Sequence, residues 1–392
     1  LKQEYNPDMK NIILFDPVEA RAGLLPLTLT RPVALLRHGI TTLSEKWQKA
    51  IPGTYSYSTQ DYLSAKYPMI EAADGDNLFI AGNLHPDQEL VEAILSLEPG
   101  EALTQGAAII ARRGNGEPQK TKAYEGNPLA LNHVWDIFML NDEALRRDFA
   151  SLTAGRESQP LSDTCRLIGD PSQLFIEEGA TVEGAIINVT KGPVYVGRDA
   201  EIMEGACLRG PIALCEHAVV NMGGKIYGAT TLGPYCKVGG ELNNVVMTGY
   251  SNKAHDGFLG NAVIGEWCNL GAGCTASNLK NTYAPVRVWS MAENSFIKTD
   301  LQFCGLIMGD HSKAGINTMF NTATVVGVGV NFYGAGFPRT FIPSFTEGST
   351  LGMKPVIMDR FFDTATRMMA RRHKELTPVD KEIFITINEN TL

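Results

Sequence analysis

The sequence predicts an α/β domain, then a long all-β domain built as a parallel β-helix, and finally a C-terminal α-helix. A period of six residues in the middle of the chain fits neither the 3.6-residue turn of a helix nor the two-residue alternation of a strand, and it is typical of hexapeptide-repeat coils. The eight aliphatic residues with this spacing are Val196, Ile202, Leu208, Leu214, Val220, Ile226, Leu232 and Val238. Two further observations are alternating strand and helix patterns before residue 154 and an amphipathic stretch at 355–374.

Small or compact residues stand two positions before most of these aliphatics. They are Ala200, Ala206, Ala218, Gly224, Thr230 and Cys236. We expect each aliphatic to point inward at a corner of a triangular coil, where the small residue lets the chain turn. Because such a coil cannot bury its faces one rung at a time, the repeat commits a long stretch of chain to one architecture.

The N-terminal part reads as strands alternating with helices. Apolar runs predict strands at 11–15, 77–82 and 106–114, and helical patterns begin within 34–47 and cover 86–97 and 141–153. This alternation implies an open, largely parallel sheet. We expect the polar segment 115–125 to be a surface loop.

Polar sequence at 154–164 marks a domain boundary. We therefore expect an α/β domain over 1–160, the coil over 161–352, and a helix with a tail over 353–392. The coil has insertions, and the segments 251–273 and 312–336 repeat a pattern of Ser, Lys and Ala followed by an aliphatic-Gly pair. The helix at 355–374 should pack its apolar face on the coil or on a partner subunit.

Net charge and cysteine usage limit the classes of function. The net charge of −9 argues against a general nucleic-acid or membrane-surface binder, which needs a basic surface. The seven cysteines form no C-x-x-C pair, which predicts reduced thiols, and Cys207, Cys236 and Cys274 fall where a small apolar side chain packs well. With no membrane-length apolar run and no signal-peptide pattern, we expect a cytoplasmic protein without membrane contact.

One motif carries a family resemblance. It consists of Ser251, Lys253, His255, Leu259-Gly260, Ile264-Gly265, Asn269, Leu270-Gly271-Ala272-Gly273, Thr275 and Asn278. This stretch resembles the acetyltransferase domain of the bifunctional N-acetylglucosamine-1-phosphate uridyltransferase/glucosamine-1-phosphate acetyltransferase family. The resemblance implies a left-handed β-helix that forms a homotrimer, acetyl-CoA as acyl donor, and an amino sugar phosphate or nucleotide sugar as acceptor.

The resemblance also implies roles for the motif. His255 would be the general base that takes the amine proton, and the backbone amide of Ala272 would face the thioester oxygen as an oxyanion donor. Asn269 and Asn278 would position the sugar. The alternative is that His255 is a loop histidine without a catalytic role.

Three further substrate-binding residues follow from the same resemblance. Lys225 and Lys253 would face the sugar phosphate, and the spacing from Glu241 to His255 fits the family. The alternative is that Lys225 and Lys253 are solvated lysines on the coil surface without a role in binding. The family's lysine pair is replaced by Asn243-Asn244, and its tyrosines are replaced by Phe258 and Leu279. This chain therefore has fewer side chains than the family that could contact the sugar phosphate. The residues that depart from the family pattern are Asn243, Asn244, Phe258 and Leu279.

The first domain resembles sugar-phosphate nucleotidyltransferases, which have a Rossmann-like fold. It keeps Pro26-Leu27-Thr28, Arg31-Pro32 and Leu35-Leu36, but Asp16-Pro17-Val18-Glu19 replaces the glycine-rich phosphate loop. Acidic side chains there oppose a triphosphate. Val33 replaces the sugar-phosphate lysine, and Asn83 replaces the metal-binding aspartate.

The domain thus reads as degenerate, and Mg²⁺ is expected only if it is active. Arg21, Arg31 and Lys46 are its remaining anion-binding candidates.

Three functions stay open. The best is acyl-CoA-dependent N-acyltransfer to an amino sugar. The alternatives are nucleotidyl transfer with a non-standard phosphate loop, and a non-enzymatic scaffold that binds sugar nucleotides. A zinc site is not expected, because His217 and His255 are the only coil histidines before His311 and lack the necessary close pair.

Overall fold

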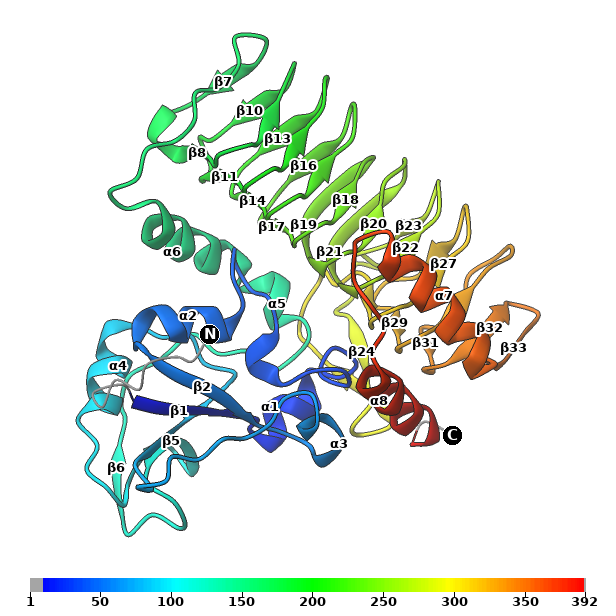
Figure 1. The fold of residues 1–392 in the computed structure, drawn as a ribbon. Helices are drawn as coiled ribbons and strands as arrows, with labels where there is room; N and C mark the ends of the chain where they lie inside the picture. Colours follow the sequence, from blue (N-terminus) through cyan, green and yellow to red (C-terminus); the bar gives the residue numbers. More distant parts are fainter. Residues whose placement is uncertain (1–9, 391–392) are drawn as a thin grey trace. The chain divides into compact units, whose positions relative to one another are not determined.

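The computed structural model describes residues 10–390, which divide into two compact units. The first holds the chain up to Leu24, Thr30–Leu36 and Thr41–Asn132, and the second holds Leu25–Leu29, Arg37–Ile40 and the chain from His133 onward. Figure 1 traces both along the sequence. The division falls at residue 132 and not near 160, so the helix at 141–153 goes with the second unit.

The first unit is built on a six-stranded sheet with the order β2-β1-β3-β5-β4-β6. Strand β1 pairs in parallel with β2 and β3, whereas β5 runs antiparallel to both β3 and β4. Strands β4 and β6 pair in parallel, so three of the five strand pairs agree with the predicted largely parallel sheet. Only β5 departs from it, because β4 and β5 are joined by a tight turn that permits only antiparallel pairing. The strands are β1 (Lys10–Phe15), β2 (Gly53–Ser58), β3 (Asn77–Ala81), β4 (Glu101–Gln105), β5 (Ala108–Arg113) and β6 (Lys120–Ala123).

Strand β6 corrects the expected loop at 115–125. All four of its residues are exposed, which is why the segment reads as a loop in the sequence. The helices of this unit are α1 (Val18–Gly23), the short 3-10 turn η1 (Val33–Leu35), α2 (Leu43–Ala50), α3 (Asp61–Ser64) and α4 (Gln88–Leu95). Helix α2 begins with a reciprocal capping box between Thr42 and Glu45, and Asp87 caps α4.

The second unit contains the predicted β-helix, whose short strands form three faces (Figure 1). Face 1 holds β7 (Arg166–Ile168), β10 (Ile186–Asn188), β13 (Cys207–Arg209), β16 (Lys225–Tyr227) and the first halves of β19 (Glu241–Gly249) and β21 (Phe258–Glu266), followed by β23 (Thr275–Ala276) and β28 (Met319–Phe320). Face 2 holds β8 (Leu174–Ile176), β11 (Val194–Val196), β14 (Ile212–Leu214), β17 (Thr230–Leu232), the second halves of β19 and β21, β26 (Ile307–Met308), β29 (Val325–Val326) and β31 (Phe341–Ile342). Face 3 holds β9 (Thr181–Val182), β12 (Glu201–Ile202), β15 (Val219–Val220), β18 (Lys237–Val238), β20 (Asn252–Lys253), β22 (Asn269–Leu270), β27 (Lys313–Ala314), β30 (Asn331–Phe332) and β32 (Thr346–Ser349).

The register explains the six-residue period. Cys207 pairs with Lys225 and Val219 with Lys237, so one rung takes eighteen residues, or three hexapeptides. All eight predicted aliphatics are buried in the coil interior, as are the small residues before them. Lys225 then pairs with Glu241, sixteen residues on, which is why the period breaks after Val238.

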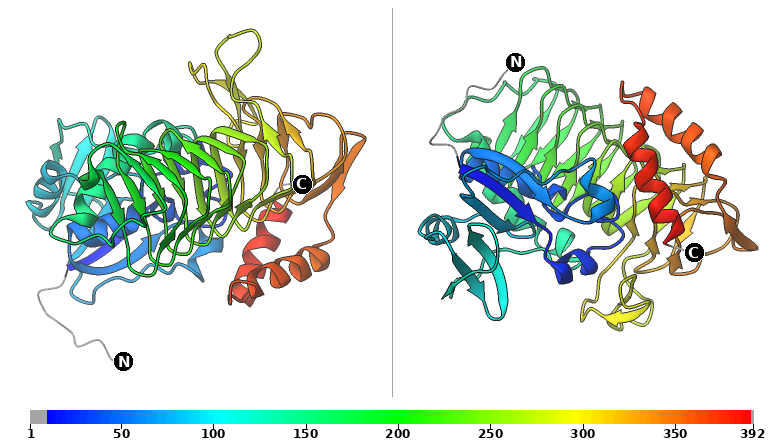
Figure 2. Two further views of the ribbon diagram at one scale, coloured as in Figure 1. Left: turned by 90° about the horizontal axis from the view of Figure 1, so that it is seen from above. Right: turned by 60° about the horizontal axis from the view of Figure 1, so that its bottom comes forward.

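The remaining elements of this unit attach to the coil. Helix α6 (Asn141–Thr153) follows the short α5 (Asp136–Met139), and its Leu145 and Phe149 pack in one cluster with Ala213 of face 2. A hairpin of β24 (Arg287–Ser290) and β25 (Ser295–Lys298) projects from the rungs (Figure 2). The coil ends in β33 (Gly352–Pro355), which turns back on β32, and the short 3-10 turn η2 (Pro171–Gln173) lies near its start.

The C-terminal segment forms two helices where one was expected. Helix α7 (Met358–Ala370) is the predicted amphipathic helix, and α8 (Pro378–Glu389) lies in the segment expected to be a tail. Helix α8 starts with Thr377 and Asp380 in a capping box and with Pro378 in its first turn. In this unit, α7 lies along the later rungs and α8 lies beside it (Figures 1 and 2).

An aromatic ladder follows the corner between faces 2 and 3. We use the term corner ladder for His217, Tyr235, Tyr250, Trp267 and His311. Their ring centroids lie 4.3 to 6.1 Å apart from rung to rung, and all five residues have a φ between 54° and 60°. This left-handed backbone costs about 1–2 kcal/mol per residue, which stacking of about 0.5–1.5 kcal/mol per pair partly offsets.

The cysteine prediction holds for most positions. Cys236 and Cys274 are buried, and burial raises the pKa of the Cys236 thiol to about 12. Cys207 is exposed on face 1, so its predicted packing role is wrong. Adjacent residues of a strand face opposite sides, so Cys207 points outward beside the inward Leu208.

The interior packing yields a stability prediction. Leu232→Ala should lower the free energy of unfolding by roughly 2 to 5 kcal/mol, because Leu232 is fully buried and leaves a cavity. Met222→Ala, at a side chain that is 72% exposed on the same coil, should change it by less than about 0.5 kcal/mol. Denaturant unfolding of both variants tests this, and equal effects would contradict the inward-facing role of the aliphatic repeat.

Candidate functional site

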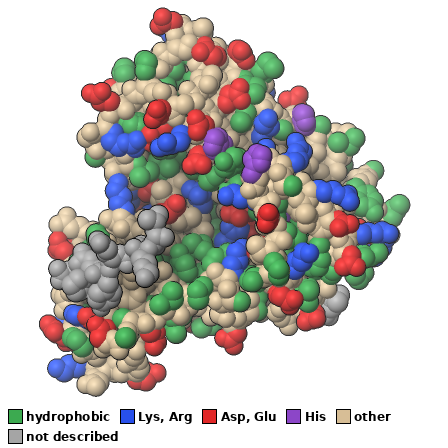
Figure 3. All heavy atoms as spheres, viewed as in Figure 1, with side chains coloured by type: hydrophobic (Ala, Val, Ile, Leu, Met, Phe, Trp, Pro, Cys, Tyr) green, Lys and Arg blue, Asp and Glu red, His purple; other side chains and the backbone are tan. Residues whose placement is uncertain are grey.

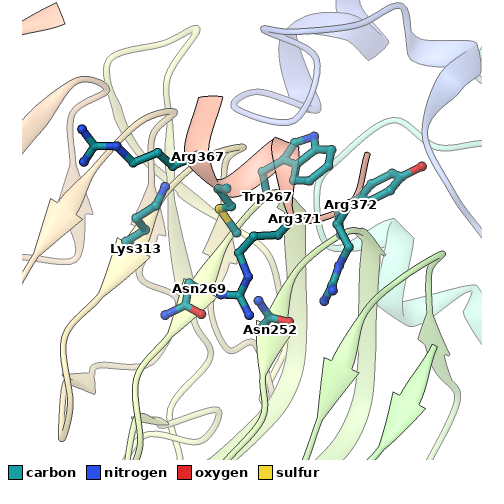
Figure 4. A pocket seen from close by; sticks show the side chains of 9 residues that line it. Asn252, Trp267, Asn269, Lys313, Arg367, Arg371 and Arg372 are labelled. Atoms are coloured by element: carbon teal, nitrogen blue, oxygen red, sulfur yellow. The ribbon is translucent and has the colours of Figure 1, made fainter. Parts of the chain in front are cut away.

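A pocket of about 350 Å³ lies between face 3 and helix α7 (Figure 4). We call it the α7 pocket. Its lining residues are Tyr250, Asn252, Trp267, Asn269, Lys313, Arg367, Met368, Arg371 and Arg372. Of these, only Asn269 belongs to the predicted site.

Three adjacent strands of face 3 each place one outward side chain in this pocket. Asn252 pairs with Asn269, and Asn269 pairs with Lys313, so the three stand in a row on adjacent strands, about 4.8 Å apart. Their sequence neighbours Lys253, Leu270 and Ala314 turn inward.

Helix α7 supplies the opposite wall of the pocket. Arg367 and Arg371 are four residues apart and therefore share a helix face. Figure 4 shows Arg371 reaching toward Asn252 and Asn269, with Arg367 near Lys313.

The pocket is cationic. Four of its nine lining residues carry a basic side chain and none carries an acidic one. Arg367 makes an exposed 3.9 Å ion pair with Asp363, one turn earlier on α7. Within residues 10–390, the guanidinium groups of Arg371 and Arg372 have no hydrogen-bond or ion-pair partner.

Lys313 is the inner cation of the α7 pocket. Its ammonium group donates a 2.8 Å hydrogen bond to the carbonyl oxygen of His311. Burial lowers the pKa of Lys313 to about 8, against a weaker opposing effect of Cys268. Charge on Lys313 therefore responds to pH in a range where the arginines stay ionised.

The predicted catalytic pair lies on a different line of the coil, the edge where face 3 turns into face 1. His255 follows β20 and Ala272 follows β22, both are exposed, and they occupy neighbouring rungs. The Gly273 amide donates to the Asp256 carbonyl at 2.9 Å, which ties the two turns together. Among the described residues, nothing accepts a hydrogen bond from the Ala272 amide.

Asn269 links the edge to the pocket. It lies three residues before Ala272, and three residues of chain span at most about 10 Å. The exposed histidine, the free amide and the cationic pocket are thus within reach of one extended ligand.

Lys253 occupies an unexpected place. It is fully buried, in register with the inward Val238, so it cannot face a phosphate outside the coil. Its ammonium group donates to the carbonyl oxygens of His255 and, at 3.5 Å, of Gly239, and burial lowers the pKa of Lys253. The lysine thereby holds the turn that carries His255.

The other predicted substrate residues lie on face 1 or after it. Lys225 and Glu241 are register neighbours there, and Glu241 accepts a 2.6 Å hydrogen bond from the Tyr227 hydroxyl. The carboxylate raises the pKa of Tyr227 to about 12. Asn278 follows β23 and donates to the side-chain oxygen of Asn261 at 2.8 Å.

In the first unit, Asp16 fills the position where the related enzymes have a phosphate loop. Its carboxylate accepts hydrogen bonds from the Thr59 hydroxyl at 2.6 Å and the Val33 amide at 2.7 Å, and it pairs with Arg21 at 2.9 Å. Burial raises the pKa of the Asp16 carboxyl, although these three partners act to lower it. The Asp16 carboxylate therefore occupies hydroxyl, amide and guanidinium donors of the kind that would bind a phosphate.

The other anion-binding candidates of this unit are also engaged. Arg21, Arg31 and Lys46 are all buried, and Lys46 donates to the hydroxyl of Thr41 at 2.9 Å. Asn83, at the expected metal position, donates to the side chain of Asn132. Over residues 10–390, no group of three or more His, Cys, Asp and Glu side chains could hold a metal ion.

Charged side chains of both signs are interspersed on the face drawn in Figure 3. The basic lining of the α7 pocket is a local feature, because the whole chain has a net charge of −9.

Among the described residues, none of the helices combines the length and the apolar character that crossing a membrane requires.

Residues 12–157 match the model of a family described as sugar nucleotidyl transferase. This match confirms the resemblance that the motifs of the first domain carry. No curated protein matches the chain.

Solved structures that the chain matches include two UDP-N-acetylglucosamine acyltransferases. The one from Francisella novicida is 10% identical, with 58% of this chain and 87% of that chain covered and a TM-score of 0.26. The one from Arabidopsis is 13% identical, with 55% and 80% covered and a TM-score of 0.24. The acetyltransferase domain of PglB from Neisseria gonorrhoeae, in complex with acetyl coenzyme A, is 13% identical, with 88% and 100% covered and a TM-score of 0.19. Likeness this low leaves the chemistry to the residues of this chain.

The Asp16–Arg21 pair yields a second prediction. Asp16→Asn should destabilise the first unit by about 3 to 5 kcal/mol, because it leaves a buried guanidinium without its counter-charge. Glu89→Gln, at an exposed residue of α4, should change stability by less than about 1 kcal/mol. Thermal unfolding of both variants compares them, and an unchanged melting temperature in Asp16→Asn would show that the loop does not depend on this carboxylate.

Proposed function

We propose that this protein transfers an acyl group from an acyl-CoA to the amine of an amino sugar phosphate or nucleotide sugar, acting as a homotrimer with His255 as general base. The observation that carries the proposal is the exposed His255 beside the free amide of Ala272 on the next rung. Acyl transfer needs these two groups together, a base for the amine and a donor for the oxyanion.

The chemical step balances without a further reactant. The amine nitrogen attacks the thioester carbonyl while the His255 imidazole takes its proton, and negative charge collects on the carbonyl oxygen beside the Ala272 amide. The carbon–sulfur bond then breaks, and the imidazolium returns the proton to the departing thiolate. The products are an amide and a free thiol.

The setting of the edge supports a trimer. His255 and Ala272 lie on an exposed edge of the coil, where together they form only one wall of an acceptor site. Exposed apolar side chains occur on the same edge, at Met222 (72% exposed) and Ile316 (69% exposed), and they favour contact with a second coil. A neighbouring subunit would then supply the rest of the acceptor site.

Nucleotidyl transfer is the second candidate, because residues 12–157 match a sugar nucleotidyl transferase family. The internal use of Asp16 and Arg21 weighs against it, since both would have to separate before a triphosphate could bind. A scaffold that binds a sugar nucleotide without turnover is the third candidate. Magnesium-dependent release of pyrophosphate would favour the second, and binding without any product would favour the third.

The direct test measures free thiol released from acetyl-CoA with glucosamine-1-phosphate as acceptor. His255→Ala should lower kcat by about 10²- to 10⁴-fold, the usual contribution of a general base. His217→Ala, at a half-exposed coil histidine on the corner ladder, should leave kcat within a few fold. If folded wild-type protein releases no thiol with a panel of amino sugars, acyl transfer is wrong.

A further inference from the structure

We propose that the α7 pocket binds the 5′-diphosphate and base of a nucleotide. No family resemblance assigned this pocket. Six of its lining residues lie outside the region of the acetyltransferase motif: Tyr250, Lys313, Arg367, Met368, Arg371 and Arg372. Because the claim concerns binding alone, it stands whether or not His255 acts as a base.

The charge of the pocket calls for an anion. Arg371 and Arg372 converge with Lys313 on one space without any acidic side chain in its lining. Like charges gathered in one site repel each other, and a bound anion removes this cost. Guanidinium groups match phosphate geometry with two parallel hydrogen bonds, which makes phosphate the fitting partner.

The helix dipole does not account for this arrangement. Basic residues are favoured at the end of a helix, and α7 ends at Ala370. That rule covers Arg371 and Arg372, but it does not explain why Lys313, from a strand of the coil, lines the same space. The convergence of cations from two elements indicates a binding site.

The size of the pocket indicates more than a lone phosphate. A volume of about 350 Å³ is typical of a site for a drug-sized ligand. Trp267 and Tyr250 form an aromatic wall, and the amides of Asn252 and Asn269 offer both donors and acceptors. Asparagine amides pair well with the edge of a base, and aromatic side chains pack against it.

Two molecules share this chemistry, namely the CoA of an acyl donor and a nucleotide sugar. Both carry a nucleoside 5′-diphosphate, so both suit the same cations. Equilibrium binding with separate ligands distinguishes them. Preference for CoA would assign the pocket to the donor, and preference for a UDP-sugar would assign it to the acceptor.

The test is calorimetric titration of the full chain with CoA, ADP, UDP-N-acetylglucosamine and inorganic pyrophosphate. We expect saturable binding of at least one nucleotide, tighter than that of pyrophosphate. The double variant Arg371→Gln/Arg372→Gln should weaken it at least tenfold, because it removes two charge-assisted contacts. Arg360→Gln, an exposed arginine of α7 that does not line the pocket, should bind like wild type.

Two results would overturn the proposal. One is the absence of saturable binding by every nucleotide in the set. The other is equal affinity in the double variant and in Arg360→Gln, with melting temperatures that show both to be folded. Because no turnover is measured, a failure here is separate from a failure of the acyl-transfer proposal.

The pH dependence of ADP binding gives an independent reading. The groups around Lys313 are Cys268 inside the coil, Tyr250 on the corner ladder, and Arg367, Arg371 and Arg372 from α7. The arginines stay charged, whereas Lys313 loses its proton as pH rises through about 8.

Affinity for ADP should therefore fall between pH 7.5 and 9.5, a range in which the terminal phosphate, with a pKa near 6, keeps its charge. Lys313→Arg should remove most of that decline, because the guanidinium keeps its charge. An identical decline in wild type and Lys313→Arg would show that Lys313 does not face the anion.

Discussion

The corner ladder holds together the parts of the coil unit on which the pocket depends. Its last ring, His311, lies 5.7 Å from the ring of Phe361 on α7 and 5.2 Å from that of Phe384 on α8, both edge to face. Phe345 completes this aromatic cluster at 5.1 Å from Phe361. Phe361 is one of three buried residues of α7, beside Ala365 and Met369, so these aromatic contacts contribute to fixing where the arginines of α7 stand. The carbonyl of His311 also holds Lys313, so one residue positions cations on both walls of the pocket.

Buried polar groups shape the neighbouring turns in a similar way. Ser251 donates to the Gly265 carbonyl and accepts from the Cys268 amide, and Ser312 makes the corresponding bonds to Gly327 and Val330 one repeat later. The lysines that follow these serines both donate to a carbonyl two residues away, although Lys253 points into the coil and Lys313 lines the pocket. The repeated Ser-Lys-Ala pattern is thus a structural device for tight turns. The position of a lysine in this pattern therefore does not predict whether its side chain is buried or exposed to solvent.

This difference marks how far the sequence predicts the structure. The coil was predictable because inward aliphatics such as Leu214 and Leu232 repeat at a fixed interval, and helix α6 was predictable because its pattern is long. The antiparallel β5 follows from the tight turn after β4, a strand that the sequence analysis does not predict, and the exposed β6 depends on pairing with β4, which its own polar sequence does not encode. Asn269 was found through its motif, whereas the pocket was missed because its arginines come from a helix that folds back on the coil. The signal was present in the four-residue spacing of Arg367 and Arg371, which places both on one face of α7.

The two units treat anions in opposite ways. In the first, Asp16 supplies an internal negative charge to Arg21, Thr59 and the Val33 amide, so donors suited to a phosphate are already satisfied. In the second, Arg371 and Arg372 have no counter-charge among the described residues, and under our proposal a bound nucleotide supplies one. A buried ion pair costs much to break, whereas Arg371 and Arg372 have no ion pair to lose before a phosphate binds. Phosphate recognition in this chain is therefore favoured in the coil unit, whereas the first domain matches a sugar nucleotidyl transferase family without that family's glycine-rich phosphate loop.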